Sequence, residues 1–227
     1  MGNKKADMVF TDPPYNVNIS SVVTKMSIDN DNLSEEEFNK FLDKSFKIIK
    51  DNINKEAHIY ICCNDKCIVP FKLTANKYFN ESKSNIFYWV KDLPGLGWGY
   101  RPQYELILFY TDQETIRFYD KTESNVWEAP KSCSSTFRKQ EKDNINKSIS
   151  QLHPTIKPTS LIARAIKNSS PNETDIILDI FGGSGSTLIA CERMGRNCYM
   201  SELDEYYCNV IIDRWELLTK QKAIKEE

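Results

Sequence analysis

Four residues near the start of the chain, Asp12-Pro13-Pro14-Tyr15, bring together a carboxylate, a prolyl carbonyl and an aromatic ring. They follow the mostly apolar residues 7–10, which are typical of the end of a short buried strand. We therefore expect them at the carboxyl edge of a sheet, where open α/β sheets bind ligands. Because two successive prolines fix two φ angles and supply no N–H donors, the turn is predicted to be a rigid group of hydrogen-bond acceptors.

Such a group suits the chemistry of an exocyclic amine on a heteroaromatic base. The amine is a poor nucleophile because its lone pair is delocalised into the ring. The Asp12 carboxylate and the Pro13 carbonyl would hold its two N–H bonds and localise that lone pair, more strongly as positive charge develops. The Tyr15 ring would stack on the base. Proline-rich turns with an acid also occur as purely structural features, and these residues alone leave both interpretations open.

A second motif lies towards the other end of the chain. Residues 175–181 are typical of a buried parallel strand, and they lead into Gly182-Gly183-Ser184-Gly185 and a predicted helix. Glycines at a strand-to-helix turn let a ligand lie against the backbone above a helix N-terminus. A dinucleotide fingerprint would need a further glycine where Leu188 stands. Glu202 follows the next predicted strand, where an acid is placed to bind the hydroxyls of a ribose.

Asp12-Pro13-Pro14-Tyr15 resembles the catalytic motif of amino-group DNA methyltransferases. Its position ahead of the glycine turn resembles the circular permutation of their β class. The resemblance implies that Asp12 and the Pro13 carbonyl hold the target amine, and that Tyr15 stacks on a base flipped out of the duplex.

The glycine turn extends this likeness, because Phe181 to Gly185 resembles the S-adenosylmethionine motif of the same enzymes and Glu202 matches their ribose-binding acid. Residues 153–158 resemble the segment that contacts the methionine portion of this cofactor. S-adenosylmethionine is therefore the expected cofactor. Its expected contacts are Thr155, Lys157, Asp179, Phe181, Gly182, Gly183, Ser184, Gly185 and Glu202.

The alternation of predicted strands and helices indicates a doubly wound, Rossmann-like α/β sheet with mostly parallel strands. The segments 85–90 and 104–110 are predicted to pair as an antiparallel hairpin at the end of the sheet, because the link between them is short. His58, within a predicted strand, is expected to be a satisfied core residue. Helices are predicted over residues 35–49, 66–79, 159–169 and 206–220, the first opened by a capping box at Ser34.

Two segments are expected to approach DNA. The glycine-rich loop of the hairpin carries Trp98 and Arg101, and the resemblance places this hairpin beside the target base; for Trp89 and Trp98 core packing is the alternative. The stretch from about 111 to 152 loses periodicity and becomes basic, so it is interpreted as a target-recognition insertion, with a solvated loop as the alternative. Its candidate DNA contacts are Arg138, Lys139 and Lys142.

Composition limits the domain number, the state of the cysteines and the expected location of the protein. The 227 residues, 40% hydrophobic and 27% charged, fit one globular domain over residues 1–227. Seven irregularly spaced cysteines predict buried free thiols rather than disulfides or a zinc site. A net charge of −2 argues only weakly against nucleic acid, since a local basic patch matters more. With no membrane-length apolar run and no cleavable signal, we expect a cytoplasmic protein, and the resemblance implies a bacterial or phage origin.

We hypothesise that the chain methylates N6 of adenine in double-stranded DNA, with the base flipped out and no metal required. N4-cytosine methylation uses the same geometry, but that family motif more often begins with serine than with an aspartate such as Asp12. A catalytically silent DNA-binding module and a nicotinamide dehydrogenase are further alternatives, and Leu188 disfavours the dehydrogenase.

The resemblance also raises an expectation about the start of the chain. Relatives usually carry a Gly-Asp segment and a strand ahead of the Asp-Pro-Pro-Tyr strand, whereas only residues 1–5 come before it here. A missing N-terminal domain or an incomplete adenine pocket is therefore expected, and a homodimer stays open.

Overall fold

A seven-stranded sheet forms the centre of the computed structural model, which describes residues 1–17, 31–95, 99–111, 118–132, 134–136 and 156–226. The strands lie in the order β5-β3-β4-β2-β1-β6-β7. Among the described residues only β4 runs antiparallel to its neighbours, so the sheet is mostly parallel, as predicted. The strands are β1 (Ala6–Thr11), β2 (Ile53–Cys63), β3 (Asn85–Val90), β4 (Tyr104–Thr111), β5 (Val126–Glu128), β6 (Ile176–Asp179) and β7 (Asn197–Met200).

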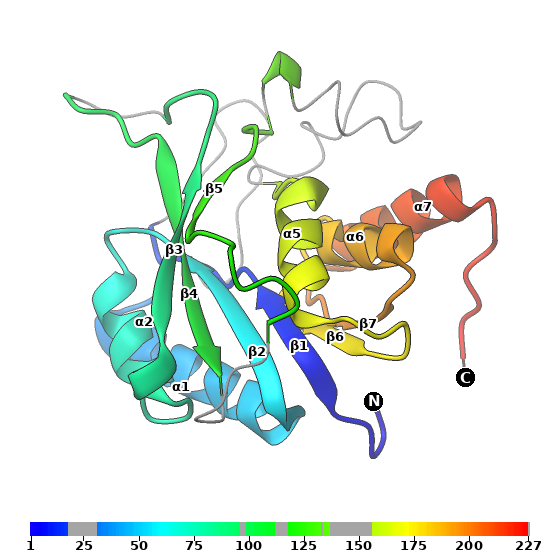
Figure 1. The fold of residues 1–227 in the computed structure, drawn as a ribbon, viewed down its shortest axis with the longest axis horizontal. Helices are drawn as coiled ribbons and strands as arrows, with labels where there is room; N and C mark the ends of the chain where they lie inside the picture. Colours follow the sequence, from blue (N-terminus) through cyan, green and yellow to red (C-terminus); the bar gives the residue numbers. More distant parts are fainter. Residues whose placement is uncertain (18–30, 96–98, 112–117, 133, 137–155, 227) are drawn as a thin grey trace.

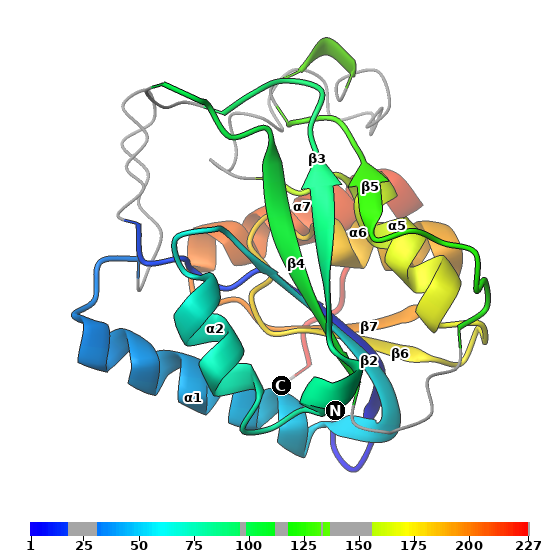
Figure 2. The same cartoon turned by 60° about the vertical axis from the view of Figure 1, so that its left-hand side comes forward.

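Helices cover both faces of this sheet, which confirms the doubly wound architecture. Figures 1 and 2 show α1 and α2 on one side and α5 and α6 on the other, with α7 beside α6. A separate apolar core lies under each pair of helices. The helices are α1 (Glu35–Asp51), α2 (Ile68–Ala75), α5 (Thr159–Ser169), α6 (Ser186–Met194) and α7 (Glu205–Thr219), and a short 3₁₀ helix, Glu81–Lys83, precedes β3.

Local sequence explains where the first two helices begin. Ser34 and Glu37 form the predicted capping box, in which each side chain accepts a hydrogen bond from the other residue's backbone N–H. These bonds satisfy groups that the first turn of α1 would otherwise leave unpaired. α2 begins at Ile68, later than predicted, and Pro70 lies in its first turn, where a missing N–H breaks no helical hydrogen bond.

β3 and β4 pair as the predicted antiparallel hairpin, with Trp89 opposite Glu105. One further strand, β5, pairs with β3 and forms the edge of the sheet beyond the hairpin. β5 comes from the stretch 111–152, for which no regular element was predicted, and Trp127 anchors it at 1% exposure. Trp89 is also buried, and its indole N–H donates to the Ala129 carbonyl at 2.8 Å. Trp89 is therefore a core residue.

Two predicted core features are present in the structure. His58 is 3% exposed, its Nδ1 lies 2.7 Å from Ser169 Oγ, and burial lowers its pKa to about 4. Among the described residues no group of three or more histidines, cysteines and acids is placed to hold a metal ion. Of the six cysteines that the structure describes, Cys62, Cys63, Cys67 and Cys191 are buried free thiols, and Cys198 and Cys208 are free and partly exposed, while Cys133 lies outside the described residues.

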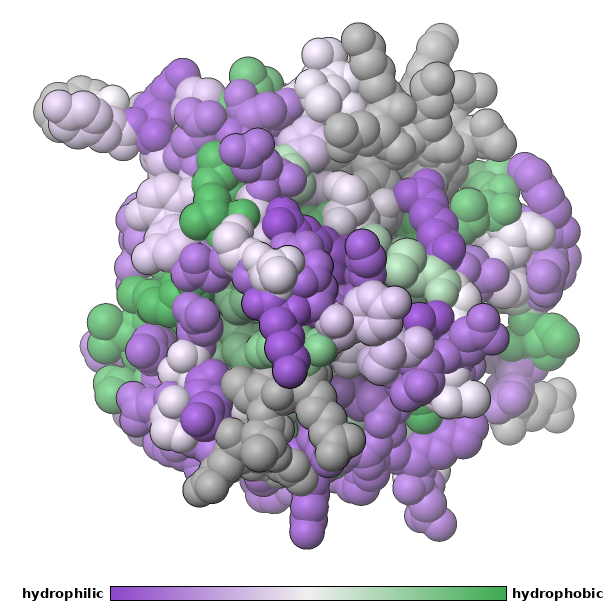
Figure 3. All heavy atoms as spheres, viewed as in Figure 1, coloured by the Kyte–Doolittle hydropathy of each residue, from purple (hydrophilic) through white to green (hydrophobic). Residues whose placement is uncertain are grey.

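The surface seen in Figure 3 is largely hydrophilic, with apolar residues gathered over α2. Val69 and Leu73 of this helix are 62% and 65% exposed. In the part of the chain that the structure describes, no helix has both the length and the apolar character needed to span a bilayer.

Candidate active site

The two sequence motifs meet in one cavity. β1 and β6 are adjacent parallel strands, with Met8 opposite Ile177, so the turns that follow them leave the same edge of the sheet. A cavity of about 360 Å³ lies between these turns. Asp12 lines it from the β1 side and Gly182 from the β6 side. The fold thus brings together two motifs that are far apart in the sequence.

The glycine turn is shaped by its backbone and by close neighbours. Gly183 and Gly185 adopt φ angles of 52° and 80°, a region that side chains disfavour. A Cβ atom at Gly182 would lie 2.8 Å from the side chain of Met200. Glu202 accepts a hydrogen bond from the Gly183 N–H at 2.6 Å, which ties the end of β7 to the turn. These contacts leave exposed backbone as one wall of the cavity.

α7 supports this turn from behind. Arg214 is 2% exposed, and its guanidinium donates to the carbonyl oxygen of Ser184. Ile211 lies against Gly185, since a Cβ atom there would be 3.0 Å from Cγ1 of the isoleucine. The position of the turn therefore depends on a helix that lies outside the glycine motif itself.

Asp179, the last residue of β6, is a buried acid beside the cavity. Its carboxylate accepts hydrogen bonds from Thr187 Oγ1 at 2.6 Å, Thr11 Oγ1 at 2.9 Å and the Phe181 N–H at 3.1 Å. Burial raises its pKa to about 7, because loss of hydration outweighs the opposing effect of these three donors. Nearby Asp12 raises it further.

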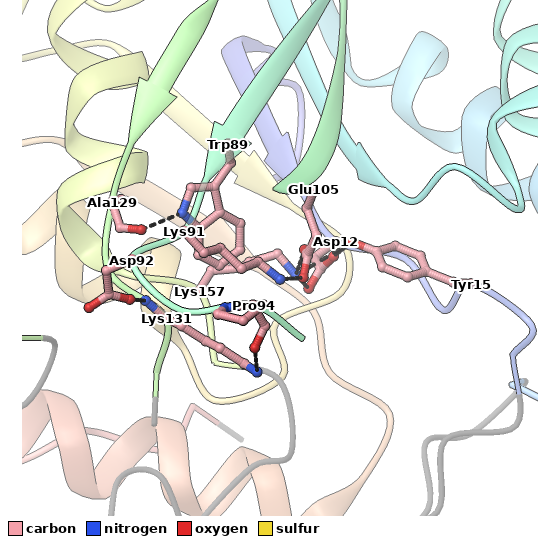
Figure 4. Close-up of polar contacts among 10 residues, drawn as sticks. All are labelled: Asp12, Tyr15, Trp89, Lys91, Asp92, Pro94, Glu105, Ala129, Lys131 and Lys157. Atoms are coloured by element: carbon pink, nitrogen blue, oxygen red, sulfur yellow. Dashed lines mark hydrogen bonds and ion pairs between the residues drawn. The ribbon is translucent and has the colours of Figure 1, made fainter. Parts of the chain in front are cut away.

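Figure 4 shows a row of charged side chains that begins with Asp12 and alternates in sign. The Tyr15 hydroxyl donates to one Asp12 oxygen at 2.6 Å, and the Lys157 ammonium donates to the other at 2.5 Å. Lys157 also lies 3.2 Å from Glu105, whose second oxygen accepts from Lys91 at 2.5 Å. The site thus holds two acids and two lysines in alternating order.

Attraction between opposite charges keeps Lys157 and Glu105 ionised, although both side chains are largely shielded from water. Burial alone would lower the pKa of Lys157, but Asp12 and Glu105 raise it well above its usual value. Burial alone would raise the pKa of Glu105, but Lys157 and Lys91 bring it below its usual value. For Tyr15, burial and the Asp12 charge both raise the pKa, so its hydroxyl stays protonated as a donor.

Most of the sequence-predicted site residues surround the cavity. Gly185 lies behind them as the N-cap of α6, and Arg101 is exposed on the hairpin loop. Thr155, Trp98, Arg138, Lys139 and Lys142 fall outside the described residues. The predicted residues that line the cavity are Asp12, Pro13, Pro14, Tyr15, Lys157, Asp179, Phe181, Gly182, Gly183, Ser184 and Glu202.

Three residues were missed by sequence reasoning. Glu105 interrupts an otherwise apolar and aromatic strand, and that interruption was the only signal. Ser186 lines the cavity, and its buried Oγ has no hydrogen-bond partner among the described residues. Arg214 lies within the predicted helix over 206–220, where an isolated arginine gives no sign that it reaches the glycine turn.

A family model described as DNA methylase matches residues 6–213 of this chain. The type II methyltransferase M1.MboII of Moraxella bovis is 28% identical, over 91% of this chain and 88% of the relative. M.HpaI of Haemophilus parainfluenzae is 30% identical, over 92% of this chain and 67% of the relative. The DNA adenine methyltransferase YhdJ of Escherichia coli is 25% identical, over 97% of this chain and 79% of the relative.

Solved structures share the fold at lower identity. The cytosine-N4-specific PvuII DNA methyltransferase superposes with a TM-score of 0.66 at 15% identity, over 97% of this chain and 89% of its own. The M1.HpyAVI–SAM complex superposes with a TM-score of 0.64 at 20% identity, over 94% and 90%. At these identities the likeness establishes the arrangement of strands and helices.

Proposed function

Because the chain belongs to the DNA methylase family of N6 and N4 methyltransferases, we propose that it transfers the methyl group of S-adenosylmethionine to N6 of adenine in double-stranded DNA. The observation that carries this proposal is the shared cavity, in which Asp12 lies across from the glycine turn. Methyl transfer needs the two halves of the site side by side, because the amine and the methyl donor must approach each other in line at close range.

The residues of the glycine half fit S-adenosylmethionine. Glu202 follows the end of β7, where it would reach the ribose, while Gly182 and Gly183 offer backbone without side chains. The unpartnered Ser186 hydroxyl gives the site a polar group that a ligand would satisfy. When bound, the cofactor supplies an electrophilic methyl group on a positively charged sulfur.

The residues of the Asp12 half fit the acceptor. An ionised carboxylate has about four lone-pair sites, so Asp12 can accept from Tyr15, Lys157 and an incoming amine together. The Pro13 carbonyl is the second acceptor. Together they draw the amine nitrogen towards tetrahedral geometry and stabilise the positive charge that develops on it. Flipping the base out of the duplex costs a few kcal/mol, which stacking on Tyr15 helps to offset.

Adenine is favoured over cytosine by Asp12, since the motif of N4-cytosine enzymes more often begins with serine. The relative YhdJ, which is named a DNA adenine methyltransferase, supports this choice. The PvuII enzyme, which is named as cytosine-N4-specific, keeps the alternative open. Incubating the protein with DNA and S-adenosylmethionine, then digesting the DNA and identifying the methylated nucleoside by mass spectrometry, separates the two. N4-methylcytosine as the product would rule out the adenine assignment.

Asp12→Ala tests the reaction itself. We expect loss of methyl incorporation into DNA, because the Asp12 carboxylate faces the amine, while the dissociation constant of S-adenosylhomocysteine, the demethylated cofactor with a neutral sulfur, should stay within about twofold of wild type. Asp12→Asn is the matched variant: it keeps one acceptor oxygen without the charge, and we expect residual activity above that of Asp12→Ala. Incorporation is measured with labelled cofactor and binding by calorimetry. An Asp12→Ala protein with wild-type turnover excludes this role, and a wild-type protein that binds DNA without binding the cofactor favours the silent module.

A further inference from the structure

Glu105 is a buried acid that the reaction described above does not use. Because β4 runs against its neighbours, its first residues lie at the edge where β1 and β2 end, and Glu105 reaches the active site from there. Its side chain is 18% exposed. Both of its oxygens lie within 3.2 Å of an ammonium group, one from Lys157 and one from Lys91.

The geometry separates the roles of the two lysines. Lys157 touches both acids and lies 5.6 Å from the centre of the Tyr15 ring. Lys91 pairs with the other oxygen of Glu105 and lies 4.7 Å from the Trp89 ring. Figure 4 shows the four charged groups side by side, with the tryptophan beside the lysines. Among the ion pairs of the described residues, Lys91 is linked to Asp12 through Glu105 and Lys157.

The charges of this group sum to zero with Glu105 ionised and to +1 without it. Methyl transfer develops positive charge on the amine held by Asp12, and the methyl donor arrives with a positive sulfur. A surplus positive charge a few ångströms away opposes both. We propose that Glu105 is a positioning residue whose negative charge cancels the surplus positive charge of the two lysines. Asp12 and the cavity can then still attract the positive sulfur of the cofactor and the amine as it becomes positive. This inference rests on the function proposed above and adds to it a residue and an electrostatic role.

The first test measures cofactor discrimination and needs no turnover. S-adenosylmethionine carries the positive sulfur, and S-adenosylhomocysteine is the same molecule without the methyl group and that charge. We expect Glu105→Gln to weaken binding of the charged form on the order of tenfold while changing binding of the neutral form much less. Both dissociation constants are measured by calorimetry. An unchanged ratio of the two constants overturns the proposal.

The second test restores the charge balance. Glu105→Gln alone should lower kcat on the order of tenfold, with little change in KM for DNA. Adding Lys91→Met removes the surplus charge, so the double variant should recover most of kcat and of the affinity ratio. A purely structural role would also restore kcat, because removing both partners relieves an unpaired buried charge. It would leave the ratio of the two affinities unchanged throughout, so recovery of that ratio is the result that only the electrostatic role predicts. Thermal unfolding of each variant shows that it is folded.

The outcomes distinguish this proposal from the function on which it rests. A wild-type protein that methylates DNA, with no rescue in the double variant, overturns the role of Glu105 alone. If the wild-type protein binds S-adenosylmethionine without methylating DNA, the methyl-transfer proposal fails and the affinity ratio still decides the role of Glu105. If it binds neither form of the cofactor, both proposals fall.

Discussion

At the scale of single residues, burial sets the chemistry of Asp179. Its folded pKa of about 7 lies above its ordinary value of 3.8, so the folded protein binds a proton that the unfolded chain has already released between these values. The contribution of this group to the unfolding free energy should therefore fall as pH rises from about 4 to about 7, by at most roughly 1.4 kcal/mol per pH unit. Above that range its contribution no longer changes.

Asp179→Asn should remove this part of the pH dependence. Asparagine keeps an acceptor for Thr11 but does not titrate, so the variant should lose less stability than wild type between pH 5 and pH 7. Urea unfolding at several pH values measures the difference. Thr187→Val is the control, because it removes a donor to this carboxylate but no titrating group, and its stability should still fall over this pH range. A pH slope in Asp179→Asn equal to that of wild type contradicts the assignment.

At the scale of elements, the two ends of α6 offer a matched comparison. Gly185 and Gly195 both have left-handed φ angles, 80° and 64°. A Cβ atom at Gly185 would meet Ile211 at 3.0 Å, whereas one at Gly195 would meet nothing within 4 Å. Alanine at either position costs about 1–2 kcal/mol of backbone strain. Only at Gly185 would the added methyl group also press the glycine turn against Ile211 of α7.

Gly185→Ala should therefore weaken S-adenosylmethionine binding. If displacement of the glycine turn costs about 1.4 kcal/mol of binding free energy, the dissociation constant rises about tenfold. Gly195→Ala should lose comparable stability and bind the cofactor as wild type does. Calorimetric dissociation constants, measured beside thermal unfolding, separate the two effects. Equal cofactor affinity in the two variants would mean that contact with Ile211 does not hold the turn in its binding conformation.

Sequence patterns were most informative for elements with a clear period or cap. The strand over 85–90 and the helix over 159–169 have the predicted bounds, because a run of β-branched and aromatic residues marks the strand and an amphipathic face marks the helix. β5 was not predicted, since its three residues are too few to show a period and it is held by burial of Trp127. Glu105 was missed for a related reason: its partners Lys91 and Lys157 come from other parts of the chain.

At the scale of the whole molecule, the proposed reaction requires DNA to bind at the sheet edge where Asp12 and the glycine turn lie. The hairpin of β3 and β4 projects beyond the body of the protein at this edge, as Figure 1 shows, and carries the exposed Arg101. Net charge is −2, so attraction to phosphates must come from a local excess of cations. Residues 130–147 supply such an excess in the sequence, and their role in recognition stays a prediction.

Replacing Lys139 and Lys142 together with alanine tests that role. If both lysines neutralise phosphates, DNA binding weakens and the slope of log K against log salt falls by about 0.9 for each phosphate that is no longer neutralised. Lys47→Ala with Lys55→Ala is the control of equal charge, because both lysines lie where α1 ends and β2 begins, at the opposite edge of the sheet. Fluorescence anisotropy with a labelled duplex, repeated across a salt series, measures both slopes. Equal slopes in the two double variants would remove the basic stretch from the DNA-binding surface, because loss of net charge alone would then account for the effect.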